Sequence, residues 1–214
     1  MNEGTGYWTP EKTKRFEIEC RIRRIKNDMF TAKCRAAAED PADLDLIKPE
    51  RTLFCGDFDE NEKKNVPGSQ EFQCVMYLID KIKKEGESKE NKREIGGVSS
   101  LMEDKLKEIA FDDAEWRKSK YEAEYAELAL AKRCWELDSE NIDLYIKNRF
   151  GNELQKKYKA DPEYKRLEKE ETRLVEKHKQ AFENFLQKNR NLPEVKEWLE
   201  FKAALDANGI ALDE

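Results

Sequence analysis

Apolar and polar residues alternate along the first part of the chain, whereas apolar residues recur with helical spacing after about residue 85. Alternation is typical of a half-buried strand, and recurrence every three to four residues is typical of an amphipathic helix. Residues 83–97 separate the two patterns, because they contain almost no apolar side chain and end in an Ile-Gly-Gly triplet. The sequence therefore predicts a small β domain over 1–82, a charged linker over 83–97 and a helical domain over 98–214.

A hairpin is the favoured interpretation of residues 16–36. Apolar side chains occupy the even positions of two runs separated by the turn signal Asn27-Asp28, namely Phe16, Ile18, Cys20, Ile22 and then Phe30, Ala32, Cys34, Ala36. One register places these side chains on a single face and the charged ones on the other, as a two-stranded pairing requires.

A helix over the same residues is the alternative. Six apolar positions recur in steps of four and three residues, as in a heptad seam: Ile18, Ile22, Ile25, Met29, Ala32 and Ala36. Thr9 and Pro10 would form the N-cap and the first helical position. The helix leaves Phe16, Phe30 and both cysteines off this seam, so strands are preferred.

Two further strand candidates support the β interpretation. They cover residues 51–58 and 70–79, with turn chemistry in Val66-Pro67-Gly68 between them. Four short strands set off by turns predict a small antiparallel barrel or curled sheet, and their order over 16–80 resembles a small OB-fold barrel. The expected fold class is α+β, with this N-terminal antiparallel β domain followed by a C-terminal antiparallel helical bundle.

Five helices are predicted in the C-terminal part. Their expected starts are Ser100, Asp112, Ser139, Asp161 and Leu192, at capping residues or Pro dipeptides. Gly151 weakens the third helix, and Asn208-Gly209 ends the fifth. Each helix has an apolar stripe opposite a charged face, which is typical of an antiparallel bundle.

Composition agrees with a helix-rich, solvated protein. Of the 214 residues, 41% are charged and 38% are hydrophobic, and the formal net charge is −6. No run approaches the ~20 apolar residues of a membrane-spanning helix. The N-terminal residues lack the basic and apolar regions of a signal peptide, and the five cysteines include no close pair. A cytoplasmic protein with free thiols and no zinc is expected, with Cys20, Cys34 and Cys74 facing inward.

No catalytic signature occurs in the chain. Gly-rich phosphate loops, dinucleotide fingerprints and nucleophile elbows are all missing from the sequence. The single histidine, His178, falls on the apolar stripe of the fourth helix and is expected to pack there. We therefore expect no enzyme activity, no cofactor and no metal site.

A basic segment is the main candidate for binding. Residues 12–35 hold nine basic and three acidic side chains, a net charge of +6. In the hairpin register Arg21, Arg23, Lys33 and Arg35 share one outward face. Aromatic residues expected near this face are Phe54, Phe58 and Tyr77. Cations that meet phosphates beside rings that stack on bases are typical of single-stranded nucleic-acid binding.

Two functions follow from these features. The first is a non-enzymatic accessory protein that binds single-stranded DNA or RNA through the β domain and a protein partner through the helices. The alternative is a pure protein-interaction subunit, an adaptor or inhibitor, that acts through its charged amphipathic helices. Salt dependence separates the two, because phosphate contacts weaken steeply with added salt.

Overall fold

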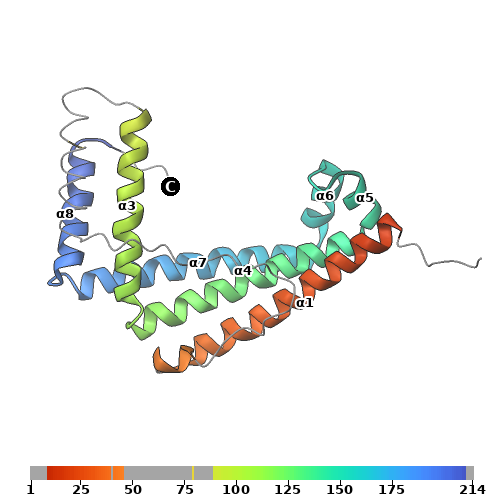
Figure 1. The fold of residues 1–214 in the computed structure, drawn as a ribbon, viewed down its shortest axis with the longest axis horizontal. Coiled ribbons are helices and arrows are strands. Elements are labelled where there is room, and N and C mark those ends of the chain that lie inside the picture. Colours follow the sequence, from red (N-terminus) through yellow and green to blue (C-terminus); the bar gives the residue numbers. More distant parts are fainter. Residues whose placement is uncertain (1–8, 40, 46–78, 80–88, 211–214) are drawn as a thin grey trace, which may run out of the picture. The chain divides into compact units, whose positions relative to one another are not determined.

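The computed structural model describes residues 9–39, 41–45, 79 and 89–210, and all regular structure within them is helical (Figure 1). The elements are α1 (Pro10–Ala37), the 3-10 helix η1 (Pro41–Asp45), α3 (Lys89–Ala110), α4 (Ala114–Glu140), α5 (Ile142–Asn148), α6 (Asn152–Ala160), α7 (Pro162–Lys188) and α8 (Pro193–Ala207). The α+β prediction with an OB-like N-terminal domain is wrong for these residues, since none of them lies in a strand.

Residues 16–36 belong to α1, so the hairpin is wrong and the helical alternative is confirmed. The Thr9 side chain accepts a hydrogen bond from the Lys12 backbone N–H at 3.2 Å, and Pro10 begins the helix. Ile18 and Ala32 on the heptad seam are buried. The alternating pattern was misleading because a helix buries one residue in every three or four. Apolar residues between those positions, such as Phe16 and Phe30, are therefore left exposed.

Other parts of the N-terminal prediction are only partly described. Residues 51–58 and 70–78 lie outside the described residues, while Ile79 is helical and buried. Of the expected linker, residues 89–97 form the start of α3 and residues 83–88 lie outside the described part. The proposed domain limits remain a prediction.

The chain divides into two compact units, and α7 contributes to both. The first comprises residues 1–55 and 114–181, and the second comprises residues 56–113 and 182–214. No described helix combines the length and the apolar character needed to cross a membrane.

Helices α1 and α4 form an antiparallel pair in the first unit (Figure 1). Near the start of α1, Ile18 clusters with Trp135 and Ile142. Near its end, the Arg35 guanidinium lies over the ring of Tyr121, 5.6 Å from its centroid. The N-terminal part of α1 thus contacts the C-terminal part of α4, and the C-terminal part of α1 contacts the N-terminal part of α4.

Helix α7 packs antiparallel against the opposite side of α4. Ser119 Oγ lies 3.0 Å from His178 Nδ1, and Lys177 Nζ lies 2.6 Å from a Glu122 carboxylate oxygen. At 3.6 residues per turn, Ser119 projects about 160° around α4 from Tyr121, and Glu122 lies about 60° from Ser119. The first unit therefore places α4 between α1 and α7 (Figure 1).

Gly151 divides the predicted third helix into α5 and α6. Its backbone is extended, with φ −70° and ψ 146°, and a Cβ added there would lie 3.1 Å from the Asn148 carbonyl oxygen. Leu154 and Tyr158 of α6 cluster with Leu137 of α4. The break lets two short helices cover the end of α4.

The second unit contains α3, α8 and the last residues of α7. The buried side chains of α3 and α8 follow helical stripes: Ile95, Ser99, Met102, Leu106, Ala110 and Val195, Trp198, Phe201, Leu205. The capping box predicted at Ser100 is wrong because the stripe continues upstream from it. Gly209, with φ +66°, ends α8 as its sequence predicted.

Asp161 ties the start of α7 to α4. Its carboxylate accepts hydrogen bonds from Arg133 Nε at 3.1 Å and Nη2 at 2.7 Å, and caps α7 through the Tyr164 backbone N–H at 2.7 Å. The Arg133 guanidinium, followed by this backbone N–H, lowers the pKa of Asp161 to about 2.

We predict that Asp161→Asn unfolds at a lower temperature than wild type, and that Asp161→Ala unfolds at a lower temperature still. Asparagine keeps the capping oxygen and loses only the ion pair, whereas alanine loses both. Because the folded-state pKa lies below the ordinary 3.8, the advantage over Asp161→Asn should be complete above about pH 4 and shrink as the pH falls toward 2. Thermal unfolding followed by circular dichroism at several pH values tests this, and a pH-independent difference would contradict it.

Candidate functional site

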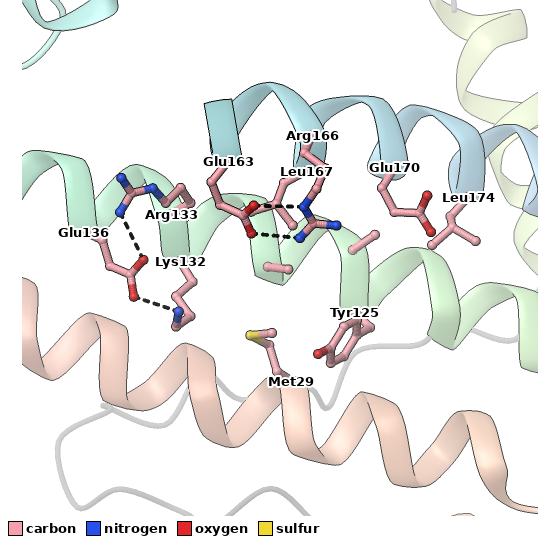
Figure 2. A pocket seen from close by; sticks show the side chains of 12 residues that line it. Met29, Tyr125, Lys132, Arg133, Glu136, Glu163, Arg166, Leu167, Glu170 and Leu174 are labelled. Carbon is pink, nitrogen blue, oxygen red and sulfur yellow. Dashed lines mark hydrogen bonds and ion pairs between the residues drawn. The ribbon is translucent and has the colours of Figure 1, made fainter. Parts of the chain in front are cut away.

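An open groove runs over α4 between α1 and α7, with a volume of about 450 Å³ (Figure 2). Met29 enters it from α1, Tyr125 and Ala129 come from α4, and Leu167 and Leu174 come from α7. Two of the lining residues of α4, Ala126 and Ala129, have short side chains, which leaves the space above the helix unfilled. The apolar floor of the groove spans Tyr125 to Ala129 on α4 and Leu167 to Leu174 on α7, whereas Lys132, Arg133 and Glu136 line the rest of the α4 side.

Most charges on the rim of this groove are paired along their own helices, while Arg133 bonds Asp161 at the start of α7 at 2.7 Å. Lys132 bonds Glu136 at 2.7 Å on α4, and Arg166 bonds Glu163 at 2.7 Å on α7 (Figure 2). Glu170 is likewise held by Arg173. A ligand in the groove does not need to neutralise these groups, so the apolar floor is what distinguishes the site.

The predicted basic strip is not assembled, because α1 distributes its four members over different sides of the helix. Arg21 and Arg35 lie over aromatic rings of α4, Trp135 and Tyr121, at 4.6 and 5.6 Å from the ring centroids. Arg23 and Lys33 are exposed.

The aromatic half of the predicted binding surface cannot be placed. Phe54, Phe58 and Tyr77 lie outside the described residues. The proposed nucleic-acid site in its hairpin form therefore has no geometric basis in the described part of the chain.

Trp135 is a contact residue that the sequence did not reveal. A second guanidinium, from Arg149, lies 4.5 Å from its ring centroid, and Tyr145 meets it edge-on at 6.3 Å. Arg21 and Arg35 are fourteen residues apart, as are their aromatic partners Tyr121 and Trp135. This equal spacing was the available signal, but it has meaning only once α1 and α4 are known to be antiparallel neighbours.

His178 is a packed histidine, as its sequence position predicted. Its ring lies 5.2 Å from that of Trp116. Buried Ser119 donates its hydroxyl proton to the Trp116 carbonyl at 2.7 Å, so its oxygen is placed to accept from His178 Nδ1–H. A serine whose proton is already given to a backbone carbonyl is not activated by this histidine.

A buried acid lies where α4 meets α6. Asp138, 2% exposed, accepts a hydrogen bond from the hydroxyl of Tyr158. Burial raises the pKa of the Asp138 carboxyl, although this hydrogen bond and Arg149 oppose the shift. Burial and the neighbouring carboxylate also raise the pKa of the Tyr158 phenol. Leu137, Leu144 and Leu154 surround Tyr158, so the pair lies within an apolar cluster.

No group of three or more His, Cys, Asp or Glu side chains among the described residues is arranged to hold a metal ion. Cys20 is exposed, which corrects the expectation that it faces inward, whereas Cys34 and Cys134 are half-buried. Cys74 lies outside the described residues.

No family model matches the chain, and comparisons with curated proteins and with solved structures also gave no match.

We predict that Tyr158→Phe destabilises the protein by about 1–3 kcal/mol, because the buried Asp138 carboxylate loses its phenolic donor. Asp138→Asn should cost less, since it removes the charge. The raised pKa of Asp138 means that the folded protein holds the proton more tightly than the unfolded chain does. The free energy of unfolding of the wild type is therefore highest below pH 3.8 and falls as the pH rises through the folded-state pKa. In denaturant unfolding from pH 4 to 7, the difference in free energy of unfolding between wild type and Asp138→Asn should shrink as the pH rises. A constant difference would show that the pKa of Asp138 is not raised by folding.

A second prediction concerns thiol reactivity. Cys20 should react faster than Cys134 with a thiol reagent at pH 7.5, because Cys20 is exposed while burial, and then Asp138, raise the pKa of the Cys134 thiol. Peptide mapping by mass spectrometry after timed labelling measures both rates. Equal rates in the native protein, with equal rates in denaturant as the control, would show that Cys134 is accessible.

Proposed function

We propose that the protein is a non-enzymatic interaction subunit that binds an amphipathic helix of a partner protein in the groove over α4. The observation that carries this proposal is the open apolar floor between two flanking helices. Such a surface is typical of helix-in-groove recognition.

The length of the groove supports a helical occupant. Its lining residues run from Tyr125 to Glu136 on α4 and from Glu163 to Leu174 on α7, twelve residues in each case. At a rise of 1.5 Å per residue, the first and last of these are about 16 Å apart along the axis, or three turns. A helix placed in the groove would lie over the strip of α4 between α1 and α7, which neither of them covers.

The residues that line the groove indicate which side chains the partner helix would place in it. Short side chains at Ala126 and Ala129 leave room for bulky apolar residues of the partner, since an interhelical distance of 8–10 Å is set by the side chains between the axes. The charged rim residues already bond within their helices. The occupant is therefore an amphipathic helix with a leucine-like stripe and a solvated polar face.

We predict that a 15-residue helical peptide with leucines at positions 1, 5, 8 and 12 binds the wild type, and that Ala129→Phe weakens this binding at least tenfold by filling the groove. Ala131→Phe is the matched control, because Ala131 lies on the same helix and does not line the groove. Fluorescence anisotropy measures affinity, and chemical-shift changes by NMR show whether Leu167 and Leu174 contact the peptide.

A peptide with glutamines in place of the four leucines controls for non-specific association. The proposal fails if the wild type binds both peptides equally, or if Ala129→Phe and Ala131→Phe have the same effect. Circular dichroism establishes beforehand that both variants fold.

A further inference from the structure

The side of α1 turned away from α4 carries cations and aromatic rings together. We define the outer face of α1 as Lys12, Phe16, Arg23, Lys26, Phe30 and Lys33, all of which are exposed. At 3.6 residues per turn these positions lie on one side of the helix, about a third of a turn from the buried Ile18 seam. Glu19 is the acidic residue on this side.

The cations of the outer face differ from the other basic residues of α1. Arg21 lies over Trp135, and Lys14 bonds Glu17 at 2.7 Å. In contrast, none of Lys12, Arg23, Lys26 and Lys33 forms an ion pair with another described residue. The helix holds nine basic and four acidic side chains in a protein of net charge −6. Its outer face is thus a local positive surface available to an anionic ligand.

Two phenylalanines stand within this positive surface. Phe30 is 70% exposed and Phe16 is 54% exposed. Along the helix the order is cation, ring, the Glu19 carboxylate, two cations, ring, cation. A polyanion alone would use only the cations, whereas a ligand with flat apolar groups between its charges would use the rings as well.

We propose that the outer face of α1 binds single-stranded nucleic acid, with phosphates on the four cations and a base stacked on Phe30. Phe30 lies between Lys26 and Lys33, about one turn from each, as a base lies between two phosphates in a single strand. Bases within a duplex are stacked on each other and cannot reach rings on the side of a helix. From Lys12 to Lys33 the surface extends about 32 Å, which gives room for several nucleotides.

This site is independent of the groove and of the hairpin strip predicted from the sequence. It keeps Arg23 and Lys33 from that strip and replaces Arg21 and Arg35 by Lys12 and Lys26. The rings are Phe16 and Phe30, which the hairpin would have turned inward.

The test uses fluorescence anisotropy with a labelled 20-nucleotide oligo-dT and oligo-U, from 20 to 200 mM salt. We expect log affinity to fall with log salt at a slope of roughly −3, from about 0.7 per neutralised phosphate. Changing Lys12, Arg23, Lys26 and Lys33 to Gln should reduce affinity at 20 mM salt at least a hundredfold. Changing Lys159, Lys165, Lys169 and Lys179 to Gln makes the same change in net charge at exposed positions elsewhere and should have little effect.

Two further measurements decide between nucleic acid and an acidic protein segment as the ligand. Phe30→Ala should weaken oligonucleotide binding about tenfold, through lost stacking, and Phe16→Ala should weaken it less. Polyglutamate should compete poorly. Failure of the wild type to bind either oligonucleotide at 20 mM salt overturns the proposal. Equal binding of polyglutamate with no effect of the phenylalanine variants overturns it in favour of an acidic protein. The groove variant Ala129→Phe should leave oligonucleotide binding unchanged, so each proposal can fail separately.

Discussion

Helix α4 packs against α1 through one side and against α7 through the opposite side. The two contacts determine which residues of α4 must be apolar and which strips of its surface stay uncovered. Two opposite packing sides leave only the intervening strips of α4 for other purposes. One strip contains Ala126 and Ala129 and becomes the floor of the groove. The groove is therefore a consequence of the arrangement, since neighbours on opposite sides of a helix cannot also cover the surface between them.

The same arrangement divides the cations of α1 into two classes. Those beside the seam, such as Arg21 and Arg35, lie over aromatic rings and extend the contact between the helices. Those a third of a turn away, such as Arg23 and Lys33, remain exposed. Basic residues that look alike in the sequence thus have different physical roles, one in packing and one at the surface.

Local signals in the sequence predicted most of the C-terminal helices, because a capping residue such as Asp161 or a Pro dipeptide acts within one turn. They failed for α1, where alternation and the heptad seam fit the same side chains. What decides between them is Trp135 and Ile142, which lie more than a hundred residues away and give Ile18 a surface to pack against. No local pattern contains that information. The groove was unpredictable for the same reason, since it belongs to three helices jointly.

The long separation between Ile18 and Trp135 also has a consequence during synthesis. The chain is made from its N-terminus at about 5–20 residues per second, so the α1 seam is complete roughly 5–25 s before the α4 residues that cover it. Local helical contacts form and break in far less time, so α1 can sample its helix throughout this interval while no partner covers the apolar side. The excess positive charge along α1 then disfavours association, because neighbouring nascent copies repel one another before their seams can meet.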